Sequence, residues 1–133
     1  MELVAHSPRA RKPATAATTA VRVAWGAVLT VCPAAVLRRC PRAPASTAAD
    51  TVVRLLGARH VVQGLATAAG VVPAAWTVVP DGLHAATMAG LALGSERWRT
   101  AACVDLAVAS AFAAAGLRAT RTAPAAGRPQ HQR

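Results

Sequence analysis

Aromatic residues are almost absent from this sequence of 133 residues, which contains three Trp, one Phe and no Tyr. Proteins that bind single-stranded nucleic acid stack bases on aromatic side chains, so the platform for such a partner is missing. A large soluble core is usually anchored by buried aromatic rings. Here apolar residues make up 54% of the chain and are mostly Ala and Val, a composition that favours closely packed helices.

Acidic residues are also scarce, because five Asp and Glu stand against fifteen Lys and Arg, for a net charge of +10. A nucleic-acid-binding surface needs its basic residues on one face. In this chain they collect where apolar segments end, which is typical of the flanks of membrane helices. They are Arg9, Arg11, Lys12 and Arg22 before the first apolar run, Arg38, Arg39 and Arg42 after it, Arg97 and Arg99 between the last two, and Arg118, Arg121, Arg128 and Arg133 at the end. We therefore expect no nucleic-acid partner.

Motifs for metal, phosphate or nucleophile chemistry are missing as well. Cys32, Cys40 and Cys103 have no metal-ligand spacing, and we expect them to act as small apolar filler. No Gly-rich phosphate loop occurs, and no serine has a catalytic base in sequence reach. We therefore expect no metal, no cofactor and no enzyme. An intramembrane enzyme that uses His84 and Asp81 as acid and base stays an alternative.

Four apolar segments, separated by Pro, Gly and basic residues, predict four helices. The helices are predicted at 21–37, 51–72, 74–94 and 100–117, between disordered basic tails at 1–20 and 118–133. Pro33 is expected inside the first helix, and Ser46, Thr47 or Asp50 is expected to cap the second. The first segment also resembles a cleaved secretory signal, but the arginines directly after it argue against this interpretation.

The tripeptide Pro80-Asp81-Gly82 leaves the third helix open to two interpretations. Inside a helix of 74–94, Asp81 would be a buried polar group among apolar residues. The same tripeptide is also a turn signal, in which case Asp81 would cap a shorter helix.

The predicted fold is an all-α, four-helix antiparallel membrane bundle. Each segment is near the roughly 20 residues needed to cross a bilayer. A soluble four-helix bundle, the competing hypothesis, would show a charged face on every helix, whereas the last two segments have one acidic residue apiece. The two termini and the second loop carry eight flanking basic residues against five on the opposite side, so both termini are expected in the cytoplasm. The expected partners are the lipid bilayer and a second copy or another membrane protein.

Six polar side chains interrupt the last three apolar segments. Such groups are costly in lipid and are usually paired within a bundle. If consecutive helices fold back on one another, Asp105 comes level with Arg59, and these two form the predicted ion pair. Asp81 lies three residues before His84 and is placed to orient its imidazole. The predicted buried polar cluster consists of Arg59, His60, Gln63, Asp81, His84 and Asp105.

This cluster is compatible with two functions. In the first, the chain is a small integral membrane protein of structural or accessory role, and the cluster sets helix packing and partner choice. In the second, it is a small proton- or ion-coupled transporter component in which Asp81 and His84 titrate. Replacing His84 by Gln separates the two hypotheses, because only a proton path requires a titrating ring.

The motifs GARHVVQG, DGLHAATM and VDLAVASAFAAAGLR resemble a group of short actinobacterial proteins described as uncharacterised membrane proteins. The resemblance covers roughly Asp50 to Arg118. It implies a small multi-pass membrane protein and supplies no activity. The residues that carry it are Gly57, Arg59, His60, Gln63, Asp81, His84 and Met88.

Overall fold

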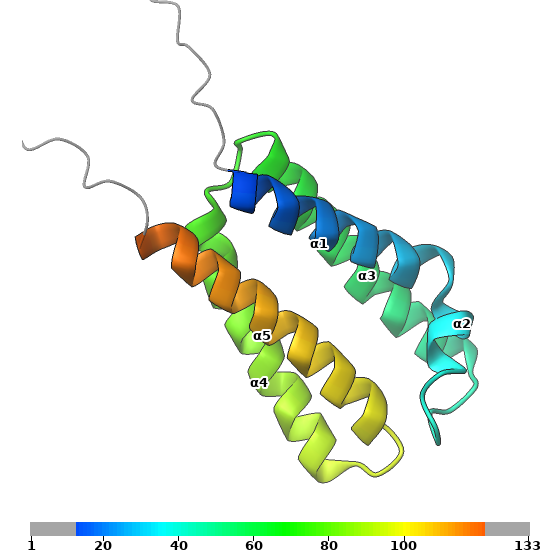
Figure 1. Cartoon of the computed structure of the whole chain (residues 1–133). Coiled ribbons are helices and arrows are strands. Elements are labelled where there is room, and N and C mark those ends of the chain that lie inside the picture. Colours follow the sequence, from blue (N-terminus) through cyan, green and yellow to red (C-terminus); the bar gives the residue numbers. More distant parts are fainter. Residues whose placement is uncertain (1–12, 122–133) are drawn as a thin grey trace, which may run out of the picture.

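The chain is all-helical, as the sequence predicts. A computed structural model describes residues 13–121, and within that range it contains five α-helices, one 3-10 turn and no strand (Figure 1). The elements are α1 Pro13–Val31, α2 Pro33–Leu37, α3 Thr47–Ala68, η1 Ala74–Thr77, α4 Val78–Gly94 and α5 Arg99–Arg121. The outer parts of the predicted tails, residues 1–12 and 122–133, lie outside the described range.

The first predicted helix is displaced and divided. α1 begins at Pro13, so residues 13–20, which were predicted to be disordered, are helical. It ends at Val31, because Pro33 has no N–H for the helix ladder and its ring would clash with the preceding turn. Cys32 leaves helical geometry with φ −123° and ψ 46°, and Pro33 then opens α2, where a missing N–H costs nothing. The prediction of Pro33 inside one continuous helix is therefore wrong.

The second predicted helix begins and ends earlier than expected. Ser46, one of the three candidate caps, accepts a hydrogen bond from the backbone N–H of Ala49 at 3.1 Å, and α3 starts at the next residue, Thr47. α3 ends at Ala68 and not at 72. Shortly afterwards Gly70 has a φ of 76°, a left-handed conformation that a residue without a Cβ adopts freely. The break before α4 is therefore centred ahead of the Pro73 at which it was predicted.

The tripeptide Pro80-Asp81-Gly82 lies inside α4 and forms no turn. Pro80 falls in the first turn of this helix, where backbone N–H groups have no helical acceptor and Pro is tolerated. Asp81 does not cap the helix, because the N-cap position belongs to Thr77 and Asp81 is fully buried. α4 ends at Gly94 as predicted, and α5 runs to Arg121, past the predicted end at 117.

The helices pack as two hairpins. α1 packs along α3, and α4 packs along α5 (Figure 1). The hairpins meet where η1 and α1 contact α5, and from there they diverge toward α2 on one side and the α4–α5 loop on the other. The expected packing of the second helix along the third is not found, because the long partner of α3 is α1. This pairing decides which polar side chains can reach each other.

Two glycines bring the backbones of α1 and α3 into direct contact. A Cβ added at Gly26 would lie 2.6 Å from the carbonyl oxygen of Gly57, and a Cβ at Gly57 would lie equally close to that of Gly26. Because backbone atoms cannot move aside, any larger residue would push the helices apart. Gly90 and Gly94, on α4, instead have open space around them.

The interior is small, and large apolar side chains cover the surface. Among the described residues, the buried apolar ones are four Ala, two Leu and one Phe. Large apolar side chains are exposed on every long helix, including Val28 on α1, Leu55 on α3, Leu83 and Leu93 on α4 and Val104 on α5. One described helix, α5, is long and apolar enough by itself to cross a membrane, and the apolar stretch Thr15–Val31 in α1 is shorter than that.

Candidate functional site

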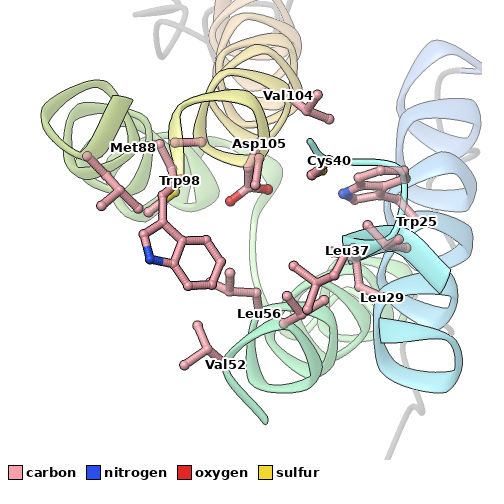
Figure 2. Close-up of a pocket in the computed structure, with 15 residues that line it drawn as sticks. Trp25, Leu29, Leu37, Cys40, Val52, Leu56, Met88, Trp98, Val104 and Asp105 are labelled. Carbon is pink, nitrogen blue, oxygen red and sulfur yellow. The ribbon is translucent and has the colours of Figure 1, made fainter. Parts of the chain in front are cut away.

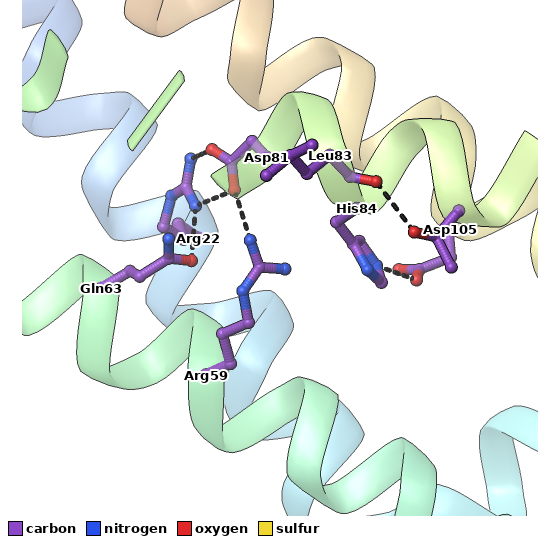
Figure 3. Close-up of polar contacts among 8 residues, drawn as sticks. Arg22, Arg59, Gln63, Asp81, Leu83, His84 and Asp105 are labelled. Atoms are coloured by element: carbon purple, nitrogen blue, oxygen red, sulfur yellow. Dashed lines mark hydrogen bonds and ion pairs between the residues drawn. The ribbon is translucent and has the colours of Figure 1, made fainter. Parts of the chain in front are cut away.

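Arg22 joins the two hairpins. The Nη1 atom of Arg22, on α1, donates to Oδ1 of Asp81 on α4 at 3.0 Å and to Oε1 of Gln63 on α3 at 3.2 Å. Its Nη2 atom pairs with the second carboxylate oxygen of Asp81, so the contact is bidentate (Figure 3). The guanidinium carbon also lies 4.2 Å from the ring centre of Phe112 on α5. One side chain therefore contacts all three other long helices.

Arg22 reaches this position because of where it lies in α1. From residue 15 onward the buried residues of this helix are Arg22, Gly26 and Leu29, a spacing that places all three on the face toward α3 and α5. The Gly26–Gly57 contact brings α1 so close to α3 that the arginine, one turn earlier, projects between the hairpins. The side chain of Arg22 is 5% exposed. Its charge is thus held inside the protein.

Asp81 is the acceptor at the centre of this arrangement and is shared by two arginines. Besides the bidentate contact with Arg22, its Oδ1 atom accepts a hydrogen bond from Nη2 of Arg59, on α3, at 3.3 Å. The side chain of Asp81 is completely buried, whereas that of Arg59 is 27% exposed. We call Arg22, Arg59, Gln63 and Asp81 the central network. Two guanidinium groups therefore share one carboxylate.

A second ion pair lies further along the α4–α5 hairpin. Nε2 of His84 is 2.6 Å from Oδ2 of Asp105 (Figure 3). Both side chains keep some exposure, 11% and 14%. Histidine is the side chain that changes charge most readily near neutral pH, so this pair can exist as a neutral hydrogen bond or as a charged salt bridge.

His60 fills the space between the two ion pairs. Its ring is fully buried, with its centre 6.5 Å from that of His84 and 5.6 Å from that of Phe112. Neither ring nitrogen has a hydrogen-bond partner among the described residues. His60 therefore packs mainly as a ring in this arrangement.

The predicted ion pair between Arg59 and Asp105 is wrong. Arg59 pairs with Asp81, and Asp105 pairs with His84. The expected contact between Asp81 and His84 is not found either, because Asp81 turns toward the arginines. Both errors have one cause. Both predictions assumed that α3 packs along α4. In the structure α3 packs along α1, and only its long side chains reach the junction of the hairpins.

Arg22 was overlooked because it was counted among the flanking basic residues at the very start of a first helix predicted from residue 21. The helix begins at Pro13 and places Arg22 well inside it. The signal that would have found it is the apolar or small character of Gly26 and Leu29 at spacings of four and seven from Arg22.

An apolar pocket of about 110 Å³ opens between the diverging hairpins, beside the second ion pair (Figure 2). Its wall includes Trp25 and Leu29 of α1, Leu56 of α3 and Met88 of α4. Two ionisable side chains line it, Cys40 and Asp105. Burial raises the pKa of the Cys40 thiol, so this group stays neutral, and Asp105 is the single charged residue of the lining.

No group of three or more His, Cys, Asp or Glu side chains suited to a metal ion occurs among residues 13–121. The three cysteines lie apart as free thiols. Comparisons with protein-family models, with curated proteins and with solved structures find no match to this chain. The functional argument therefore rests on the geometry of this molecule.

Proposed function

We propose that this chain is a small multi-pass integral membrane protein with a structural or accessory role, in which the central network fixes one hairpin against the other. The observation that carries the proposal is the distribution of side chains. Arg22 and Asp81 are buried, whereas large apolar side chains are exposed on every long helix. A protein folded in water has the opposite arrangement, because burying apolar surface is what stabilises it.

The apolar surface supports this proposal because it extends over both hairpins. Leu55 is 66% exposed, Leu83 67% and Leu93 85%. Large contiguous apolar surfaces on water-soluble monomers mark contact with a membrane or another protein. Four of the seven buried apolar residues are Ala, and small residues at helix contacts are what close helix packing in lipid favours.

The central network supports the proposal from the inside. A lone arginine or aspartate at the centre of a bilayer costs about 2.5 to 3.5 kcal/mol on insertion scales, and more by other methods. The contacts of Arg22 and Arg59 with Asp81 lower that cost, and Gln63 provides a further acceptor for Arg22. Charged residues so arranged join helices that have no large apolar interface between them.

We infer that both termini lie in the cytoplasm. Because Arg22 is buried, it no longer counts as a flanking charge, which leaves seven basic residues on the side of the termini against five in the opposite loops. A margin of two charges is small, so single substitutions at the flanks should change the orientation in part of the molecules.

Fractionation of cells that express the full chain tests the membrane assignment. We expect the protein in the pellet after extraction at alkaline pH, with a peripheral membrane protein as a control that is released. A reporter that is active only in the cytoplasm should be active when it is fused to either terminus. A well-folded monomer in the soluble fraction would instead establish the soluble four-helix bundle.

A second candidate function, a proton- or ion-coupled transporter component, is favoured by the His84–Asp105 pair. The sequence suggested Asp81 and His84 as its titrating groups, but both arginines engage Asp81, so Asp105 takes its place. In vesicles that contain the purified protein and a pH-sensitive dye, an imposed membrane potential should drive proton flux that His84→Gln abolishes. Equal flux with this variant and with the wild type would eliminate the candidate.

A further inference from the structure

The two hairpins meet at a small junction and diverge from it. α1 contacts α5 there, and beyond this point the hairpins separate toward α2 and toward the α4–α5 loop (Figure 1). Because the hairpins are not packed along their whole length, a change in charge at the junction can alter how they lie relative to each other. The side chains gathered at the junction are Arg22, Arg59, His60, Asp81, His84 and Phe112.

His60 differs from the other polar members of the junction because its polar atoms have no partner. Its exposed fraction is 0%, and neither ring nitrogen has a hydrogen-bond partner among residues 13–121. A neutral imidazole carries one N–H group, whereas the protonated ring carries two and a full positive charge. Burying an unpaired charge costs much more free energy than burying a neutral polar group. The joined hairpins thus accommodate the neutral ring and offer no acceptor to the protonated one.

The charged groups around His60 offer no compensation for a proton. Both arginines engage Asp81, and His84 engages Asp105, so the two carboxylates already have cationic or titratable partners. The guanidinium of Arg22 lies on the same Phe112 ring that contacts His60. A proton on His60 would therefore add a third positive charge beside two guanidinium groups. The groups that face His60 are Arg22 on α1, Arg59 on α3, Asp81 and His84 on α4, and Asp105 on α5.

We propose that the junction is an acid-sensitive hinge, in which the uptake of a proton by His60 separates the two hairpins. Separation exposes the ring to water, which accepts hydrogen bonds from both N–H groups and solvates the charge. Proton uptake and separation are then linked, so acid favours the separated arrangement. Water borders the junction even when the hairpins are joined, because the side chain of Arg59 is 27% exposed and that of His84 is 11% exposed. The hinge is a property of the junction and does not depend on where the chain resides in the cell.

The sign and size of the effect follow from this linkage. In the separated arrangement His60 should titrate as an exposed imidazole does, near a pH of about 6.5. Above that pH neither arrangement holds the proton, and the ratio of separated to joined molecules stays constant. Below it only the separated arrangement holds the proton, so the ratio should rise about tenfold for each pH unit. One histidine cannot produce a steeper rise.

Two native cysteines provide labels for measuring the separation. Cys32 directly follows α1 and Cys103 lies on α5, so they belong to different hairpins, and both are exposed. The full-length protein should carry Cys40→Ala and nitroxide labels at the other two cysteines. Pulsed electron paramagnetic resonance in detergent should give one distance at pH 8 and a growing population with a longer distance between pH 7 and pH 5. This range ends above the ordinary titration of carboxylates, at about pH 4.

His60→Phe keeps a ring at the same position and removes the titrating group, so the distances should no longer depend on pH. His60→Gln serves the same purpose if the Phe variant folds poorly. His84→Gln is the matched control, because it removes the neighbouring imidazole, and the pH response should persist. A response that survives both His60 variants, or that disappears with His84→Gln alone, would assign the effect to the second ion pair and overturn the proposal.

Arg22→Gln extends the test to a weaker junction, in which the separated population should be larger at each pH. Equal distance distributions at pH 8 and pH 5, both in the wild type and in this variant, would show that no acid-sensitive hinge exists. Circular dichroism at the same pH values distinguishes separation from unfolding. We expect an unchanged helical signal while the distance increases. A parallel loss of helical signal would mean that acid unfolds the chain, which would also overturn the proposal.

Discussion

Asp81 and Asp105 are each the single acidic residue of an apolar helix, yet their surroundings differ. Asp81 is completely buried and is held by two guanidinium groups and by no titratable base. Asp105 is 14% exposed, has one histidine partner and lines a pocket. The difference separates two uses of a buried carboxylate. Asp81 joins helices through two arginines. Asp105 is contacted by His84 at one of its two carboxylate oxygens.

Their partners explain the difference. An arginine remains charged at any physiological pH and offers a planar fork, so its contact with Asp81 is fixed in geometry and in charge. A histidine pair can lose its charge, and its single contact leaves half of the carboxylate free. We expect mutations at the two sites to differ accordingly in size and in kind.

The largest effect is expected from Asp81→Ala, which leaves Arg22 and Arg59 without a counter-charge. Removing one partner of a buried pair typically costs about 3 to 5 kcal/mol, and somewhat less where water can follow the charge. The folded yield and the thermal unfolding midpoint in detergent should both fall. Asp50→Ala is the control, because its carboxylate lies in the first turn of α3 and should contribute no more than about 1 kcal/mol.

Replacing both members of the main pair, with Arg22→Leu and Asp81→Leu, should restore most of that stability. Arg59 is then the only charge left in the central network, and its partial exposure lets it turn toward water. A double variant as damaged as the sum of its singles would show that the two residues act independently. A loss from Asp105→Ala as large as that from Asp81→Ala would contradict the comparison itself.

An intermediate effect is expected at the second ion pair. His84→Ala and Asp105→Ala should each cost about 1 to 2 kcal/mol, because one hydrogen bond to a charged group is lost at a site that water can reach. A double-mutant cycle measured by thermal unfolding should give a coupling below the cost of either single change. Additivity of the two changes would mean that the 2.6 Å contact contributes nothing to folding.

The smallest effect is expected from Arg59→Gln, which should cost less than about 1 kcal/mol, since Arg59 is partly exposed and Asp81 retains its bidentate partner. Arg22→Gln is the matched substitution in the buried position. Its unfolding midpoint should be clearly the lower of the two. If the two variants are equally stable, Arg22 does not hold the centre of the network.

Much of the helical framework could be predicted from the sequence because its signals are local. Ser46 caps α3 through an atom three residues away, and Pro33 ends α1 because of a missing N–H in its own residue. The break at Pro33, which was not predicted, also follows from a local rule, because a proline inside a helix lacks the N–H that the helix ladder needs. The start of α1 at Pro13 was missed because eight residues rich in Ala and Thr lack the apolar periodicity that marks a buried helix.

The sequence by itself therefore determined that the chain is helical, roughly where its segments lie, and that polar groups such as Arg59, His60 and Asp81 stand inside them. Only the tertiary structure decided the partners: Arg22 and Arg59 for Asp81, and His84 for Asp105. Pairing depends on which helices pack together, and this is set by the Gly26–Gly57 contact, which joins residues far apart in the chain. No local pattern specifies such a contact, because helix geometry fixes the face and depth of a side chain but not the helix that it meets.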